Sequence, residues 1–297
     1  MSISYSVRKL YWGKETNYGE AVTPDSVMGL PVSWDAGLEL LEEDIYAGQR
    51  GYYARVFIGR NVNPSVEFYL VDGKILPFLL GSVQNSGTGA PYTHTVTLGN
   101  TLPSMTIEAV RGSIAERVVG AMVSDWEISL EEDGLVDVSL DLVAKDISFL
   151  TSYTDPNLSL PTKTPFKWGN QTVQWGTTTL SKVRSITISG SNELQPLPRD
   201  SDGVIPGYSI LNAELEAELE VVWEDYQLAL DFLNAQQRDL TFKLVRTEGQ
   251  DEITFTLTGC LLEWASEIDY EGDELTQTIS LRPTSITIQG LDDITEW

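Results

Sequence analysis

The 297-residue sequence has one cysteine, Cys260, and one histidine, His94. A single cysteine excludes an intrachain disulfide and leaves a thiolate zinc site without enough ligands. Cys260 stands in the apolar strand pattern ITFTLTGCLLEW, so we expect a buried, unreactive thiol. His94 lies among threonines in PYTHTVT without a nucleophile motif around it, which argues against a catalytic role.

Basic residues are also scarce: 19 Lys and Arg stand against 44 Asp and Glu, a formal net charge of -25. Binding to nucleic acid by phosphate neutralisation needs a basic surface and is therefore excluded. Solubility, a salty habitat or repulsion of nucleic acid each account for the acidity. No apolar run reaches the ~18 residues of a membrane span, and the first residues lack the apolar core of a signal peptide. We expect a protein made and used without secretion or a membrane.

Motifs that carry chemistry are missing as well. SGTGAP lacks the lysine of a phosphate loop, and no nucleophile elbow or HExxH is present. RDSDG, residues 199–203, is similar to the start of a calcium loop, but Val204, Ile210 and Leu211 occupy positions that need oxygen ligands. We predict no enzyme activity, no catalytic residue, no metal site and no cofactor.

Strand patterns dominate what is present, and the clearest is NAELEAELEVVWE, residues 212–224. Alternate side chains of a strand point to opposite faces, so four glutamates share one face and apolar residues share the other. These glutamates are Glu214, Glu216, Glu218 and Glu220. Like charges ~7 Å apart along a strand are tolerated where open water or counterions screen them. An outer surface and a water-filled channel both meet that condition.

Helical patterns are limited to residues 72–83 and 224–239, and they belong to an internal repeat. Pairing Gly37 with Gly190 gives an offset of 190 − 37 = 153, and pairing Asp72 with Asp225 gives 225 − 72 = 153. Later in the chain, Trp126 and Trp264 differ by 264 − 126 = 138. Two β-rich segments can also look alike through shared alternation alone.

The repeat predicts a mainly β protein with two tandem β-barrel or sandwich domains, each with a short flanking helix. The expected organisation is an N-terminal arm (1–26), a first domain (27–150), a connector (151–175) and a second domain (176–297). We expect Phe166, Trp168 and Trp175 to anchor the connector to a surface.

Three stretches resemble the tail tube proteins of long-tailed, siphovirus-like bacteriophages: YWGKETNYGEAVTPDS, HTVTLGNTLPSMTIEA and GAMVSDWEISLEEDGLVDVSLDLVAKD. The resemblance covers the arm and most of the first half; the repeat and GSNELQPL carry it into the second half. It implies a structural virion protein, made in the host cytoplasm, that stacks as rings into a hollow tube in the virion tail. DNA passes through such a tube without specific binding, and the implied partners are tail terminator, tape-measure and baseplate proteins.

The resemblance also assigns roles to residues. The four glutamates would line the lumen, and the 153-residue offset places a second polar row opposite them: Asn61, Asn63, Ser65 and Glu67. With two fold copies per chain, three subunits would mimic a hexameric ring. The arm and the extra segment 82–100 would contact neighbouring rings, the arm through its aromatic residues Tyr5, Tyr11, Trp12 and Tyr18.

Other classes remain open at this point. A head-tail joining or baseplate protein would reuse the same fold but would not form long tubes. The eight tryptophans suggest a carbohydrate-binding β-sandwich, which needs exposed aromatic rings converging on one patch. An acid-rich all-β enzyme would need a paired catalytic site, and the sequence offers no candidate pair.

Overall fold

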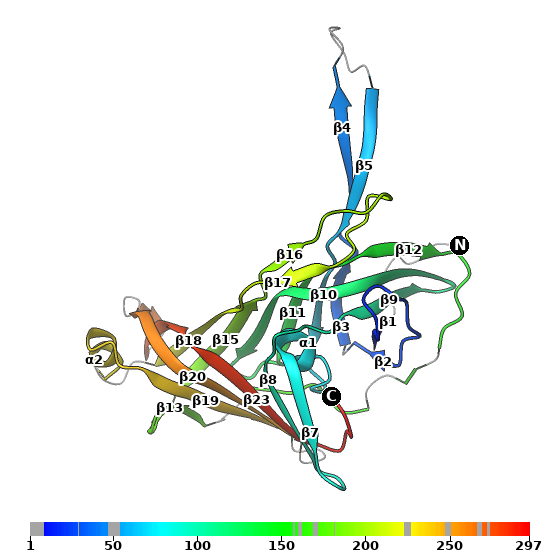
Figure 1. Ribbon diagram of the computed structural model, residues 1–297. Helices are drawn as coiled ribbons and strands as arrows, with labels where there is room; N and C mark the ends of the chain where they lie inside the picture. Colours follow the sequence, from blue (N-terminus) through cyan, green and yellow to red (C-terminus); the bar gives the residue numbers. More distant parts are fainter. Residues whose placement is uncertain are drawn as a thin grey trace.

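The computed structural model describes residues 9–28, 30–46, 54–156, 158–159, 162–168, 172–180, 182–222, 227–246, 251–265, 269–271 and 274–297. Within these ranges the protein is mainly β, with two short helices, α1 (Leu76–Leu80) and α2 (Gln227–Leu233) (Figure 1). The strands form a central sheet, two flanking sheets and two separate hairpins, and the ladders between them are antiparallel.

The central sheet carries the segment that alternates glutamate with apolar residues. Its strand order is β3 (Leu30–Asp35), β6 (Ser65–Tyr69), β11 (Asp137–Val143), β10 (Ile114–Glu131), β15 (Val183–Ser191), β18 (Glu214–Val222), β22 (Glu274–Arg282) and β20 (Glu252–Ala265). A short strand, β21 (Asp269–Glu271), also pairs with β22. The predicted strand at 212–224 is therefore confirmed as β18.

The two flanking sheets have the same strand order at their start. The first runs β2 (Ser26–Val27), β1 (Lys9–Lys14), β9 (Met105–Arg111), β10 and β12 (Asp146–Leu150). The second runs β14 (Thr178–Leu180), β13 (Val173–Trp175), β19 (Arg238–Val245), β20 and β23 (Ser285–Asp292). It then continues into β8 (Tyr92–Leu98) and β7 (Gly81–Ser86).

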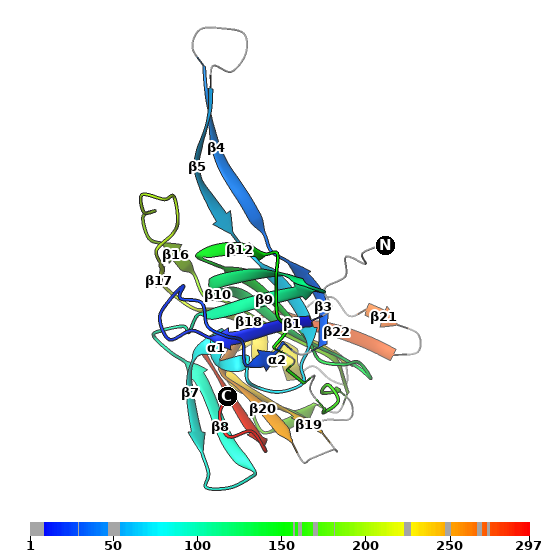
Figure 2. The same cartoon turned by 90° about the vertical axis from the view of Figure 1, so that its right-hand side faces the viewer.

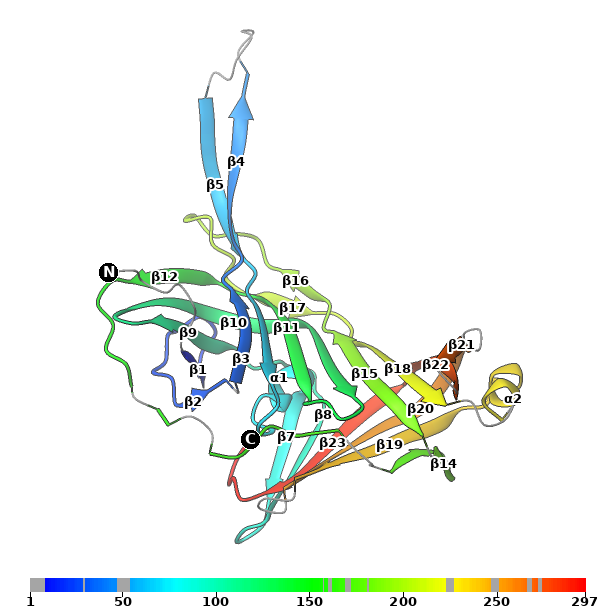
Figure 3. The ribbon, with the colours of Figure 1, turned by 180° about the vertical axis from the view of Figure 1, so that it is seen from behind.

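Two long strands, β10 and β20, each join a flanking sheet to the central sheet. Each bends at a glycine in the left-handed region, Gly120 with φ +68° and Gly259 with φ +62°. Glycine adopts this conformation without a Cβ penalty, and an irregular register at the bend re-aims the strand. The first part of each strand therefore hydrogen-bonds in one sheet and the last part in another (Figure 3).

Buried apolar side chains from both halves of the chain form one continuous cluster, which includes Leu10, Ile128, Ile188 and Phe255. Phe166, Trp168 and Trp175 are buried in it, so the predicted anchoring of the connector is confirmed. Trp175 lies in β13, however, and thus belongs to a flanking sheet.

Both predicted helices exist but are shorter than expected. Pro77 stands in the first turn of α1, and Gly81 ends the helix with φ +96°. The helix therefore covers only part of 72–83. In the second case α2 ends at Leu233, and residues 223–226 lie outside the described part of the chain.

Two hairpins stand apart from the sheets, and the larger one projects from the body (Figures 1 and 2). It consists of β4 (Leu38–Ile45) and β5 (Ala54–Val62), and the smaller one of β16 (Leu194–Pro196) and β17 (Tyr208–Ile210). The base of the larger hairpin is held by Arg60, which pairs with Asp146 at 2.6 Å. Arg199 donates to the carbonyl of Arg60 at 2.7 Å, so the direction of the projection is fixed at its base.

Candidate functional site: an acidic strand face and the edges of the central sheet

One face of the central sheet is acidic, and the other face is packed on the core. On β18, Glu214, Glu216 and Glu218 are exposed and Glu220 is half-buried, while the intervening apolar side chains are buried. Seven more exposed carboxylates from neighbouring strands share that side, namely Asp35, Glu67, Asp125, Glu127, Glu131, Asp137 and Asp141. We call these eleven carboxylates the acidic face.

Hydroxyl residues separate much of the charge. In the ladder of β15 and β18, Ser191 lies opposite Glu214 and Ser189 opposite Glu216. Across the other side of β15, Ser189 lies opposite Glu127. Adjacent strands are ~4.8 Å apart, so carboxylates on alternate strands are separated by about 10 Å. Direct like-charge pairs are unfavourable, and the intervening serine strand removes them at this part of the sheet.

Carboxylates within the acidic face nevertheless repel one another. The pKa of Asp137 is raised, first because its carboxylate is partly removed from water, and then because Glu131 and Glu67 lie nearby. At one end of the acidic face, the guanidinium of Arg282 lies 3.1 Å from the carboxylate of Glu263 and 3.8 Å from that of Glu216. A surface with this charge repels another polyanion.

The predicted second row is divided between two structural elements. Ser65 and Glu67 lie on β6, on the acidic face. Asn61 instead lies in β5, where its amide donates to Glu39 at 3.2 Å and its oxygen accepts from Arg199. Asn63 is exposed between β5 and β6.

Sequence reasoning missed the acidic residues of β10 and β11. Their signal was present in DWEISLEED and VDVSLDLV, where Asp125, Glu127, Asp137 and Asp141 alternate with apolar residues. A strand of period two shows which residues share its own face, but it does not show which strands are neighbours. The wide acidic face appears only when the ladders are known.

The central sheet ends in two edges. In the described part of the chain, β3 pairs only with β6, and the last residues of β20, 261–265, pair only with β22. Unpaired backbone N–H and C=O groups on a strand edge favour pairing with another strand. Both edges of one sheet are thus available for a partner strand.

Much of the N-terminal arm, which we expected to contact neighbouring rings, packs within its own chain. Residues 9–14 form β1 between β2 and β9, with Tyr11 and Trp12 buried. Tyr11 donates to Asp155 at 2.6 Å, and the Trp12 ring packs edge-on against Phe78 at 5.0 Å. β1 pairs with a strand about ninety residues later, which the arm's own sequence cannot reveal.

The other two aromatic residues of the arm have different positions. Tyr18 is half-buried and packs edge-on against Tyr208 at 6.4 Å. Burial is the main reason why the pKa of Tyr18 is raised. Tyr5 lies outside the described residues. Contact of the arm with a neighbouring ring stays a prediction for the segment that includes Tyr5.

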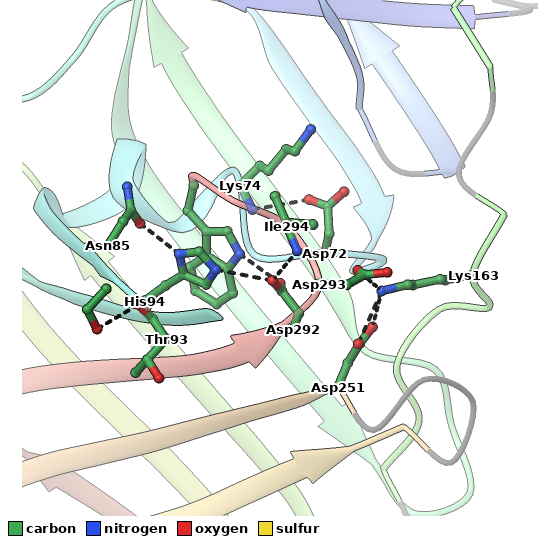
Figure 4. A network of polar contacts seen from close by, with 12 residues as sticks. Asp72, Lys74, Asn85, Thr93, His94, Lys163, Asp251, Asp292, Asp293 and Ile294 are labelled. Atoms are coloured by element: carbon green, nitrogen blue, oxygen red, sulfur yellow. Dashed lines mark hydrogen bonds and ion pairs between the residues drawn. The ribbon is translucent and has the colours of Figure 1, made fainter. Parts of the chain in front are cut away.

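The extra segment 82–100 also packs within the chain. It forms β7 and β8, and β8 pairs with β23 near the C-terminus. His94 is fully buried here, with Nδ1 2.7 Å from Asn85 and Nε2 3.1 Å from Asp292 (Figure 4). Trp297 stacks on its ring at 4.6 Å. His94 therefore fastens the segment to the C-terminus, which is a structural role.

The described residues contain no group of three or more His, Cys, Asp or Glu side chains arranged to hold a metal. Neither of the two helices in these ranges has the length and apolar character needed to cross a membrane. The carboxylates of the acidic face are spread over a surface and do not converge on one point.

We predict that Asp137→Asn stabilises the protein at neutral pH. A folded-state pKa raised above the unfolded value means that the ionised carboxylate is unfavourable in the native sheet, and this penalty disappears as pH falls through the raised pKa. The variant should melt about 1–2 °C higher at pH 7, and the difference should vanish at acidic pH. Asp202→Asn, in an exposed turn, is the control for thermal melts at both pH values. An equal gain at both pH values would contradict the electrostatic cause.

Comparison with known proteins agrees with this geometry. The chain matches the family described as phage tail tube protein over residues 6–296. No curated protein matches it. Proteins of this family are non-enzymatic structural components of the virion tail that assemble with themselves into the tube. Because the match spans nearly the whole chain, as the resemblance of its motifs predicted, the protein belongs to the phage tail tube protein family.

Proposed function

We propose that three copies of this chain close into a ring, and that the rings stack into the tail tube with the acidic face toward the channel. Viral DNA passes through that channel without specific binding. The family further suggests tail terminator, baseplate and tape-measure proteins as partners. The observation that carries the proposal is a repetition of strand register between the two halves of the chain.

The repeated register appears in the central sheet. Glu67 lies opposite Ser139 in the ladder of β6 and β11. Glu220 lies opposite Thr278 in the ladder of β18 and β22. The offsets are 220 − 67 = 153 and 278 − 139 = 139, and each neighbouring pair of these two ladders keeps them. Any two regular antiparallel ladders match pair by pair at some pair of offsets, so the support for a duplicated fold comes from the recurrence of the offset 139 in other strands.

Irregular positions repeat as well. The ladder of β10 shifts at Ser124 and that of β20 at Glu263, and 263 − 124 = 139. The bends at Gly120 and Gly259 differ by the same 259 − 120 = 139. Helix α1 moved by 153 falls inside α2. Since bulges are specific features of a fold, their repetition supports a common origin of both halves.

On this proposal, two details of the sequence alignment change. Trp264 corresponds to Asp125, not to Trp126, because the pair Trp264–Ser280 matches the pair Asp125–Asp141 at an offset of 139. Gly37 likewise corresponds to Ser189. The pair Asp35–Ser65 of β3 and β6 matches the pair Thr187–Glu218 of β15 and β18, and 187 − 35 = 152. The sequence alignment had paired identical residue types, two glycines and two tryptophans, and was one position out at both.

We therefore propose two sandwich-like units, a first unit of residues 9–150 and a second unit of residues 173–292. These bounds replace 27–150 and 176–297, because β1 and β13 take the same place in their flanking sheets. In each unit a tryptophan on this strand, Trp12 or Trp175, lies opposite the equivalent residue of the next strand, Ile107 or Leu240. The arm and the connector thus both contribute a strand to a unit.

The contact between the units suggests how subunits join. Within one chain the units meet where β10 pairs with β15. The equivalents of these strands are the end of β20 and β3, the two unpaired edges of the central sheet. Pairing β20 of one subunit with β3 of the next would repeat the internal contact, satisfy both edges and close a ring.

We predict three chains per ring. Six fold units then surround the channel, and charge follows threefold symmetry while the backbone approaches sixfold symmetry. Electron microscopy of tubes formed by the purified protein, with native mass spectrometry of isolated rings, measures the number of chains. Rings of six chains would refute the threefold arrangement and leave membership of the family intact.

The acidic face supports the assignment of this side to the channel. Duplex DNA carries one negative charge per ~1.7 Å of its axis, so a basic wall would bind it and an acidic wall keeps a hydrated gap. In the proposed ring the glutamates of β18 come three times, alternating with Ser65 and Glu67 of β6.

Replacing Glu214, Glu216, Glu218 and Glu220 by lysine should leave folding intact and make assembled tubes bind duplex DNA. Affinity should fall steeply with salt, because bound counterions are released from the DNA. The control carries lysine at four other exposed glutamates with the same change in net charge: Glu20, Glu132, Glu193 and Glu296. Equal binding of DNA inside tubes of the control would place the four β18 glutamates elsewhere than in the channel.

The hairpin of β4 and β5 is our candidate for contact between rings. It exposes large apolar side chains, among them Leu40 at 59%, Phe57 at 52% and Ile58 at 51%. A two-stranded hairpin is marginally stable alone, so such a projection in a stacking protein favours a partner surface. We propose that the partner is a subunit of the adjacent ring, a role first expected for the arm and residues 82–100.

The double substitution Leu40→Lys and Phe57→Lys should allow rings to form but prevent them from stacking. Both side chains are exposed in the single chain, so the thermal midpoint should stay the same. Leu197→Lys, at an exposed site of the smaller hairpin, is the control. Tubes of normal length from the double variant, seen by negative stain, would contradict this role.

A further inference from the structure

Two apolar surfaces at opposite ends of the folded molecule are exposed to solvent in the isolated subunit. Helix α2 exposes Leu230 at 49% and Leu233 at 74%. Strand β12, at the edge of the first flanking sheet, exposes Phe149 at 61%. The two surfaces lie far apart, with α2 at one end of the molecule and β12 toward the other (Figure 1).

The equivalent positions at the boundary between the two units are buried. Leu80 of α1, which corresponds to Leu233 by 233 − 80 = 153, is 1% exposed. Ile288 of β23, which corresponds to Phe149 by 288 − 149 = 139, is 0% exposed. Equivalent positions of the fold are thus shielded from solvent at the internal boundary and exposed to solvent at the two ends of the molecule.

Direct contacts show what makes the internal boundary dry. The side-chain amide of Asn192 donates to the carbonyl of Leu79 at 3.0 Å and to that of Val123 at 3.1 Å. Asn192 lies in the second half of the chain and Leu79 in α1, so the helix of the first unit touches the second unit. The hairpin of β7 and β8 fills the rest, because Val96 pairs with Ile288 and the N–H of Gly99 donates to Leu80 at 2.7 Å.

The second unit has no such hairpin. Only a short connection joins Leu233 to β19, whereas residues 81–104 separate α1 from β9. Correspondingly, β12 pairs only with β10 among the described residues, while β23 pairs with both β20 and β8. The missing element leaves a bare helix at one end of the subunit and a bare strand at the other.

The bare helix is longer, and the bare side chain larger, than their buried equivalents, which compensates in part for the missing hairpin. α2 is longer than α1, and Phe149 is larger than Ile288. The exposed helix is also fixed to its own unit. Asp231 accepts from Trp175 at 2.9 Å and from both sides of the Arg238 guanidinium, at 2.7 and 3.0 Å. A helix held this way presents its leucines in a set direction and loses little freedom on contact.

We propose that, in the ring, α2 of one subunit packs on β12 of the next subunit, with Leu230 and Leu233 against Phe149. The occupant of each bare surface is a second copy of this chain, because the equivalent helix and strand, α1 and β23, face each other across the hairpin of β7 and β8 at the internal boundary. The inference rests on the proposed ring and adds to it a hydrophobic contact outside the central sheet. It gives each junction between subunits its own chemistry, distinct from the internal boundary.

The test is a disulfide between subunits of the full chain. Leu233→Cys and Phe149→Cys are introduced together, and the native Cys260 is fully buried and so does not compete. Tubes are assembled, oxidised and separated on a denaturing gel without reductant. Covalent products that end at closed trimers are expected. The single variants, each oxidised alone, are the controls and should stay monomeric on the gel.

Other outcomes separate this inference from the proposed ring. Closed covalent hexamers would support the contact and overturn the threefold ring. Intact tubes without a cross-link would overturn the contact and leave the tube in place. Ladders that grow beyond a closed ring would show a contact between rings, which also overturns the inference.

A second variant covers the case in which the cysteine pair does not assemble. Leu233→Asp places a charge in the contact but changes a side chain that is exposed in the single subunit, so its thermal midpoint should match the wild type. The amount of ring that it forms, measured by light scattering, should fall at least tenfold. Leu211→Asp, at a site 55% exposed, is the matched control. Normal assembly of Leu233→Asp would overturn the inference.

Discussion

The rest of the structure depends on one constraint: each strand of the central sheet must satisfy its backbone hydrogen bonds while keeping one face dry and the other wet. A slip of one residue would turn every side chain to the wrong face. In β18 such a slip would bury Glu216 and Glu218 and expose Leu215 and Leu219. Burying unpaired carboxylates is far costlier than any cross-strand contact, so the charge itself fixes the register. The acidic face is therefore part of what specifies the fold.

The same constraint explains the bent strands. A sheet with one dry face needs a second layer to cover it, and β10 and β20 supply that layer by passing from the central sheet into the flanking sheets. The turn requires a backbone conformation that suits glycine, as at Gly120 and Gly259. At Gly190, a Cβ would come within 2.5 Å of the Trp126 ring, so the two halves of the chain approach closely where β10 meets β15. Small residues thus stand where layers or units touch.

The sequence predicted the elements of this fold better than their connections. Alternation located β18, and helical spacing located α1 and α2, because both signals are local. Tyr11 and Trp12 were assigned to an arm that contacts neighbouring rings, since the pairing of β1 with β9 appears only in the folded chain. The alignment of the two halves was one residue out at Gly37 and Trp126, because it paired like residue types, whereas the true strand partners are known only from the folded chain. The missed acidic residues have the same cause, since strand neighbours are set by the tertiary fold.

Duplication within one chain changes what an assembling protein can do with its surfaces. Identical subunits in a ring must present identical contacts, whereas two linked units can differ. In this chain β7 pairs with β8 and β8 with β23, and His94 with Trp297 fastens them near the C-terminus. In the proposed ring the second unit has no such hairpin, and its helix is open for another subunit. A permanent contact can then be large and fixed, while the contact between subunits stays smaller and forms only on assembly. In the proposed tube, the charge on the sheet face and the apolar side chains on α2 meet different neighbours, the DNA and the next subunit.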